Sequence, residues 1–122
     1  MKKEMNVDFI FGEEWRFTPE YPNYMVSNYG RVYSYYHQKI IKPFCNTGGY
    51  LTLTLTVAKK LKRVKLSRLV AMAFHANPEN KPIVHHVDCN VKNNRSDNLI
   101  WVTHDEHNEL HKTKPRKKDK KI

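Results

Sequence analysis

HHVDCNVKNNRSDNLIWVTHDEHNELH, residues 85–111, holds five of the seven histidines of this 122-residue chain. Its His pair lies within a short β-forming run, Pro82–Val87, in which apolar residues flank the two histidines. Residues 88–94 are dense in Asp and Asn, which bond to their own backbone and tolerate left-handed turns. A second β-forming run, Leu99–Val102, follows. This stretch therefore predicts a strand, a tight loop and a second strand.

A helix is predicted directly after the second strand. Thr103 can cap this helix, and Glu106 three residues later completes a capping box. His107 and His111 are four residues apart, so they share one helical face.

The adjacent histidines His85 and His86 are expected to do different work. Side chains alternate along a strand, so the two rings point to opposite faces. One ring can face a metal shared with the helix while the other faces an attacking water, because neutral imidazole binds metals and accepts protons near neutral pH. Two histidine ligands leave positions open for water and phosphate oxygens. Asn98 carries no charge, so we expect it to fix the loop that carries His86.

At these residues the sequence resembles the HNH endonucleases of phages and mobile introns. Their pattern is a His, often paired, then an Asn in a D-N-L run, then a His or Asn on the next helix, matched here by His86, Asn98 and His107. The resemblance implies a ββα-metal (His-Me finger) fold with His86 as general base. It also implies that His85 and His107 bind the metal, and that Asn98 orients the loop holding the base. Cys89 stands where the family commonly has Gly, so we expect a modestly strained left-handed residue there.

The implied reaction is metal-dependent hydrolysis of a DNA phosphodiester bond. His86 would deprotonate a water for in-line attack, and one divalent ion would bind a nonbridging oxygen and stabilise the leaving 3′ oxygen. The expected ion is Mg²⁺. Two histidines lack the carboxylate that Mg²⁺ prefers, so Mn²⁺, Ni²⁺ or Zn²⁺ are alternatives. One site cuts one strand, so a monomer should nick DNA, whereas a homodimer could break both strands.

The aromatic-rich residues 12–34 are interleaved with turn residues and predict short strands. The run VSNYGRVYS, residues 26–34, resembles the NUMOD4 motif, a small module that precedes HNH domains. That resemblance implies DNA contact by this lobe. Most of its aromatic residues are expected to form its core. Arg31, Tyr33 and Tyr35 are the expected DNA contacts, because basic and aromatic side chains suit phosphate and sugar.

A basic hairpin is predicted between the two motifs. Leu and Thr alternate from Tyr50 to Val57, which predicts a strand with one apolar face. Residues 58–63 are read as a turn and residues 64–66 as the partner strand, followed by a helix capped by Ser67 that ends before Asn77-Pro78. Cations without an acidic neighbour gather here, and we expect them to lie along a DNA backbone: Lys59, Lys60, Lys62, Arg63 and Lys65.

The composition favours a polyanionic partner. Lys and Arg outnumber Asp and Glu by 22 to 12, giving a formal charge of +10. No long apolar run or basic amphipathic helix favours a membrane, and the N-terminal residues do not form the apolar core of a signal peptide. We therefore expect a cytoplasmic protein, in the host cytoplasm if phage-encoded, that is not secreted. Cys45 and Cys89 are too far apart for a C-x-x-C zinc site and are expected to be free thiols.

The predicted architecture is α+β. Residues 1–11 would form an N-terminal extension, 12–58 a NUMOD4-like β-rich lobe that contacts DNA, 59–111 an HNH nuclease domain, and 112–122 a basic disordered tail. Larger members of the family carry a further DNA-reading domain at this end, so the resemblance implies less stringent site recognition here.

The expected function is a homing-endonuclease-like DNA endonuclease acting on double-stranded DNA, with no membrane or small-molecule partner. Two alternatives stay open. A non-catalytic DNA-binding protein with a structural metal site would bind DNA without cutting it, and His86→Ala would leave its function unchanged. An RNA-directed nuclease would prefer an RNA duplex to a matched DNA duplex.

Overall fold

The structure, a computed structural model, describes residues 7–113, with side chains up to residue 110. The predicted basic tail lies outside the described residues from residue 114 onward, and its first two residues end a helix. No helix among the described residues is long and apolar enough to cross a membrane.

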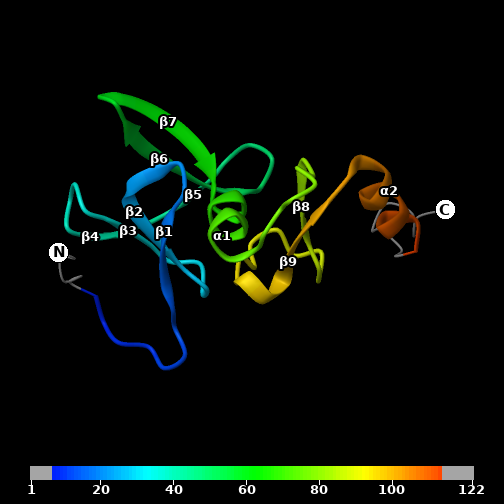
Figure 1. The fold of residues 1–122 in the computed structure, drawn as a ribbon, viewed down its shortest axis with the longest axis horizontal. Helices are drawn as coiled ribbons and strands as arrows, with labels where there is room; N and C mark the ends of the chain where they lie inside the picture. Colours follow the sequence, from blue (N-terminus) through cyan, green and yellow to red (C-terminus); the bar gives the residue numbers. More distant parts are fainter. Residues whose placement is uncertain (1–6, 114–122) are drawn as a thin grey trace.

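The chain folds into antiparallel sheets and two helices, which confirms the predicted α+β class. The first sheet runs in order β1 (Trp15–Thr18), β2 (Tyr21–Ser27), β3 (Val32–Ser34) and β4 (Lys39–Ile41). The second sheet contains β5 (Phe44–Cys45), β6 (Leu51–Val57) and β7 (Lys60–Lys65), and helix α1 follows at Leu66–Phe74. A last hairpin contains β8 (Ile83–His86) and β9 (Leu99–Val102), and α2 (His104–Thr113) ends the described chain. Helix α1 lies between the N-terminal sheets and this hairpin (Figure 1).

A hydrophobic cluster joins the N-terminal strands to the last hairpin. Its centre is α1, where Leu66, Leu69 and Val70 recur at helical spacing and are almost completely buried. The cluster continues into Val26 of β2, and it reaches Leu99 of β9 on the other side. The predicted domain boundary between residues 58 and 59 falls in the β6–β7 turn, and the core continues across it.

The basic hairpin differs from its prediction in one respect. Leu and Thr alternate as expected, with Leu53 and Leu55 buried and Thr54 exposed. The predicted turn over residues 58–63 is wrong, because β7 already begins at Lys60. Ala58 and Lys59 have φ values of 52° and 67° and make a two-residue turn, whose handedness matches the twist of paired strands. The cations therefore lie along a strand instead of a loop.

The start of α1 also differs from its prediction. Ser67 is not the cap, because α1 begins at Leu66 and Ser67 lies buried in its first turn. The N-cap position is Lys65, the last residue of β7, and it makes no side-chain capping hydrogen bond. The strand thus runs directly into the helix, and α1 ends before Asn77-Pro78 as predicted.

We predict that Leu69→Ala lowers the free energy of unfolding by about 2–5 kcal/mol, because it opens a cavity in the shared core. Leu61→Ala is the control: this side chain is 75% exposed, so its loss should change stability by only about 0.5 kcal/mol. Urea unfolding of both variants measures the difference. Equal effects at the two positions would contradict the proposed core.

Candidate active site

The histidine-rich stretch forms the predicted strand, loop, strand and helix. Strands β8 and β9 pair antiparallel, with His85 opposite Ile100 and His86 opposite Leu99. The predicted capping box starts α2: the Thr103 backbone N–H donates to Glu106 Oε1 at 2.8 Å, and the Glu106 N–H donates to Thr103 Oγ1 at 3.1 Å. These local signals place a helix immediately after β9.

Alternation along β8 sends the paired histidines in different directions, as expected. Both side chains are buried, at 6% exposure for His85 and 5% for His86. The His85 ring meets the His107 ring of α2, with centroids 5.4 Å apart and planes at 73°. On the other side, His86 Nε2 lies 2.9 Å from Asn94 Oδ1, and the Tyr50 ring centroid lies 6.4 Å from the His86 ring.

The pair His85 and His107 has the donor chemistry of a divalent metal site. Two imidazoles from different elements converge, and within residues 7–110 no group of three or more His, Cys, Asp or Glu side chains is placed to hold a metal. A site built on two nitrogens leaves coordination positions for water and phosphate oxygens. The residues present therefore fit a catalytic ion, and their assignment as ligands stays a prediction. His104 is exposed on α2, and the side chain of His111 lies outside the described part.

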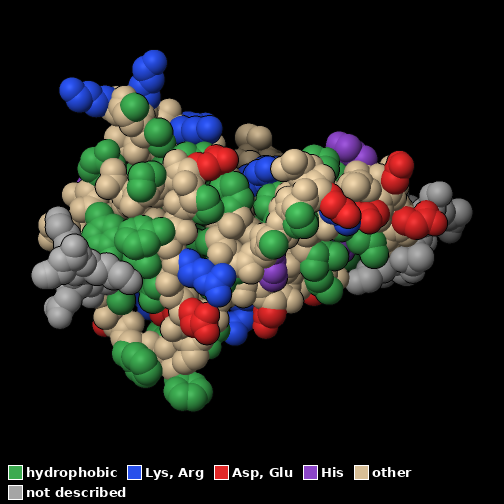
Figure 2. Space-filling model, viewed as in Figure 1, with side chains coloured by type: hydrophobic (Ala, Val, Ile, Leu, Met, Phe, Trp, Pro, Cys, Tyr) green, Lys and Arg blue, Asp and Glu red, His purple; other side chains and the backbone are tan. Residues whose placement is uncertain are grey.

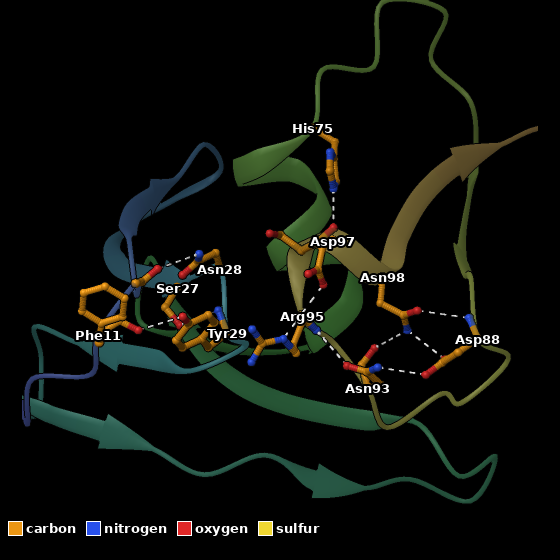
Figure 3. Close-up of polar contacts among 12 residues, drawn as sticks. Phe11, Ser27, Asn28, Tyr29, His75, Asp88, Asn93, Arg95, Asp97 and Asn98 are labelled. Atoms are coloured by element: carbon orange, nitrogen blue, oxygen red, sulfur yellow. Dashed lines mark hydrogen bonds and ion pairs between the residues drawn. The ribbon is translucent and has the colours of Figure 1, made fainter.

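Asn98 fastens the loop that follows His86 (Figure 3). Its side chain is 7% exposed, and its Nδ2 donates to Asp88 Oδ1 and to the Asn93 carbonyl, both at 2.9 Å. Its Oδ1 accepts the Asp88 backbone N–H at 3.1 Å. Both the start and the end of the loop are thus bonded to one amide, the geometry expected of a loop-fixing residue.

The loop is also held by the Asp88 carboxylate. Hydrogen bonds from the Asn93 side chain, the Asn90 backbone N–H and the Asn98 side chain lower the pKa of Asp88 to about 2. Cys89 adopts the expected left-handed conformation, with φ of 64°. Two features therefore shape the turn: an ionised carboxylate at its start and a strained residue directly after it.

The structure contradicts the predicted DNA contact at Tyr33 and gives Arg31 partners within the protein. Tyr33 is only 2% exposed and belongs to the core, so it cannot contact DNA in this structure. Arg31 binds both Glu13 carboxylate oxygens, at 2.9 and 2.6 Å, and lies over the Trp15 ring at 5.4 Å. The hydrogen bond to Glu13 raises the pKa of the Arg31 guanidinium. Arg31 is thus paired within the protein, and its assignment as a DNA contact stays a prediction. The third candidate, Tyr35, is half-buried and stacks on Phe17.

The predicted cations of the hairpin are all exposed, and they divide between its two faces. Lys60 and Lys62 are paired with Val57 and Leu55, whereas Arg63 and Lys65 are paired with Thr54 and Thr52 on the other face. Figure 2 shows Lys and Arg side chains projecting at the end of the molecule where this hairpin turns. Their assignment as DNA contacts stays a prediction.

Two residues beside His86, Tyr50 and Asn94, were not predicted from the sequence. The Tyr50 ring lies beside His86, and Lys65 Nζ lies 4.2 Å from the same ring, so a basic and aromatic path leads from β7 to the site. Asn94 contacts His86 directly. Asn94 is one of four asparagines in residues 90–98, so nothing in the sequence distinguished it from those that only shape the loop.

The chain matches two known families in the expected order. Residues 13–56 match the NUMOD4 motif, and residues 64–109 match the HNH endonuclease model. An uncharacterised HNH endonuclease of Acanthamoeba polyphaga mimivirus is 38% identical over 96 residues, which cover 79% of this chain and 29% of the relative. The DNA endonuclease I-HmuI of Bacillus phage SP01 is 40% identical over 91 residues, covering 74% of this chain and 52% of that protein.

A solved structure also matches. The structure reported for DNA binding and cleavage by the HNH homing endonuclease I-HmuI superimposes with a TM-score of 0.72 at 35% identity, covering 89% of this chain and 65% of that one. The chain spans about a quarter to half of the length of the curated relatives it matches. These findings confirm the resemblance to both families and the predicted fold class.

The Asp88 carboxylate generates a prediction about pH. Its pKa in the folded protein, about 2, is below its ordinary value of 3.8, so ionised Asp88 stabilises the fold above about pH 4, and this contribution disappears as pH falls toward 2. Asp88→Asn should therefore melt at a lower temperature than wild type at pH 7, with a gap that narrows between pH 4 and pH 2.

Thermal unfolding at several pH values measures this gap. Asp97→Asn is the matched control, because it removes an 80% exposed carboxylate that lies 3.9 Å from Arg95. A pH-independent gap for Asp88→Asn, or an equal gap for the control, would show that the carboxylate does not hold the loop.

Proposed function

This chain belongs to the HNH endonuclease family and carries a NUMOD4 motif, and from that premise we propose that it is a metal-dependent endonuclease that hydrolyses DNA phosphodiester bonds. The observation that carries the proposal is the division of the His pair. His85 on β8 faces His107 on α2, whereas His86 points away from this pair toward Asn94. One strand thus presents a ligand pair on one side and a proton acceptor on the other.

His86 would act as the general base. Its imidazole takes a proton from water, and the water oxygen attacks the phosphorus of the substrate. The bond from phosphorus to the 3′ oxygen breaks, and the leaving oxygen takes a proton from solvent. The burial of His86 limits its rotation, and Asn98 holds the loop beside it, so the ring is oriented before the substrate binds.

HNH nucleases generally use a divalent metal ion. In this chain His85 and His107 would hold it, since their rings converge from β8 and α2. When bound, the ion supplies Lewis-acid stabilisation of the negative charge on the phosphate oxygens. We propose Mg²⁺ as the physiological ion, with Mn²⁺, Ni²⁺ and Zn²⁺ as alternatives, because a site of two imidazoles suits these softer ions.

Double-stranded DNA is the proposed substrate. The path from Arg63 and Lys65 through Tyr50 leads to His86, so a backbone bound along β7 would pass beside the proposed base. The net charge of +10 favours such binding. A single site acts on one strand, so we propose that the monomer nicks DNA.

The catalytic assignment predicts the behaviour of His86→Ala on supercoiled plasmid. Wild type should convert the plasmid to nicked circles with Mg²⁺ or Mn²⁺ and not with EDTA. His86→Ala should lower the rate by about 10²–10⁴-fold, the usual contribution of a general base. His104→Ala makes the same chemical change at an exposed position of α2 and should leave the rate near wild type. A wild-type protein that binds the plasmid with either ion without cutting it would contradict the proposal.

The proposed DNA path predicts a change in salt dependence. Replacing both Arg63 and Lys65 with Ala should flatten the plot of log binding constant against log salt by about 1.8, because each lost phosphate contact removes about 0.9. Lys81→Ala is the control, since Lys81 is already paired with Glu106 at 3.2 Å. Fluorescence anisotropy with a labelled duplex measures the slopes. An unchanged slope in the double variant would exclude this face of β7.

A further inference from the structure

The turn that carries the NUMOD4 signature, residues 27–31 (SNYGR), packs on nuclease residues 94–96. The Asn28 carbonyl accepts the Ser96 N–H at 2.8 Å, and the Arg95 guanidinium lies 4.1 Å from the centre of the Tyr29 ring. Figure 3 shows Asn28, Tyr29 and Arg95 brought together from the two parts of the chain. The motif residues are therefore used for an internal contact beside the proposed active site.

Hydrogen bonds to the side chains of Ser27 and Asn28 hold this turn. The Ser27 hydroxyl oxygen is fully buried and accepts the backbone N–H groups of Tyr29 and Arg31, both at 3.1 Å. Asn28 Oδ1 accepts the Glu14 N–H at 2.7 Å. The turn can thus act as a fixed platform for the residues that it touches.

Gly30 brings the platform against Asn94. Gly30 has φ of +88°, and a Cβ at this position would lie 3.1 Å from the Asn94 carbonyl oxygen. Ser96, two residues further on, is held from both sides: Asn28 binds its N–H, and His75 Nε2 lies 2.6 Å from its carbonyl oxygen. The backbone that carries Asn94 is therefore confined.

Asn94 points from this confined backbone to the proposed base. Its side chain is 5% exposed, and its Oδ1 lies 2.9 Å from His86 Nε2. An amide oxygen only accepts hydrogen bonds, so the proton of neutral His86 is held on Nε2 and Nδ1 is left as the basic nitrogen. The Asn94 Nδ2 is buried and makes no hydrogen bond within the described part of the chain. A buried amide nitrogen without a hydrogen bond lowers stability. We therefore explain the presence of Asn94 by its hydrogen bond to His86 and not by a contribution to folding.

We propose that Asn94 is a positioning residue that sets the tautomer of His86, and that the NUMOD4 turn holds Asn94 in place. The N-terminal module would then complete the active site in addition to any contact with DNA. This inference rests on the proposed nuclease function and adds to it the support of the base.

Two substitutions of Asn94 test the first part. Asn94→Leu has a similar shape and removes the acceptor, whereas Asn94→Asp keeps an oxygen acceptor in its place. The ¹⁵N resonances of the His86 imidazole report the tautomer directly. Wild type and Asn94→Asp should show one dominant form with the proton on Nε2, and Asn94→Leu should show a mixture.

Cleavage kinetics give the second readout. Asn94→Leu should lower kcat by about 10–100-fold, the range for groups that orient a histidine in an active site, while DNA binding stays unchanged. Asn94→Asp should stay within a few-fold of wild type. Asn94→Leu with wild-type His86 resonances, or with wild-type kcat, would overturn the role of Asn94.

A pair of glycines tests the role of the turn. Gly30 and Gly49 have nearly equal φ values, +88° and +87°, so alanine brings similar backbone strain at both. Only at Gly30 does the added Cβ press on Asn94, since the Cβ at Gly49 meets nothing within 4 Å. Gly30→Ala should therefore shift the His86 resonances and lower kcat several-fold, and Gly49→Ala should do neither. Equal behaviour of the two variants would overturn the role of the turn.

These outcomes separate the inference from the proposed function. The resonances of His86 are measured without cleavage, so they decide the tautomer even if the wild-type protein cuts no DNA. If wild type cuts, His86→Ala does not, and Asn94→Leu cuts as wild type does, then the nuclease assignment stands and this inference alone fails.

Discussion

The alternation of side chains along β8 is the constraint on which the rest of the site depends. Because His85 and His86 are neighbours in a strand, they must serve opposite faces, and a slip of one residue in the pairing with β9 would exchange their roles. Leu99, the partner of His86, is 1% exposed in the shared core and fixes this register. Helix α2 follows β9 directly, so His107 contacts His85. The loop that Asn98 holds follows His86 directly in the sequence.

Features that depend on neighbours in the sequence were predictable. The ββα order and the Thr103–Glu106 capping box follow from local chemistry, the left-handed Cys89 was implied by the family resemblance, and all three are present. The prediction failed where distant residues decide. The β6–β7 turn uses Ala58 and Lys59, neither of which carries the Gly or Asn signal of a hairpin, so the strand of cations after it was read as a loop. Tyr33 looked suited to DNA, but all three residues of β3 are buried, so the fold covers both faces of this strand.

The residues of the N-terminal motif make contacts within the protein. Arg31 is bound by Glu13, and the turn of residues 27–31 packs against Asn94 and Arg95. These motif residues therefore contact other parts of the same chain. Exposed cations lie along β7, and Lys65 among them contacts Tyr50 beside the proposed base. The N-terminal strands, α1 and β9 share one hydrophobic core, which supports this arrangement. On this view the two matched families form one cooperative unit, in which one module supports the chemistry of the other.

The central claim is that adjacent histidines divide ligand and base between them. The most direct measurement is the binding of Mn²⁺, followed by electron paramagnetic resonance in the presence of a DNA duplex, for wild type, His85→Ala and His86→Ala. The account predicts that His85→Ala loses most of the bound Mn²⁺, whereas His86→Ala binds it with nearly the wild-type affinity. Loss of Mn²⁺ from His86→Ala with retention in His85→Ala, or equal loss from both, would contradict it.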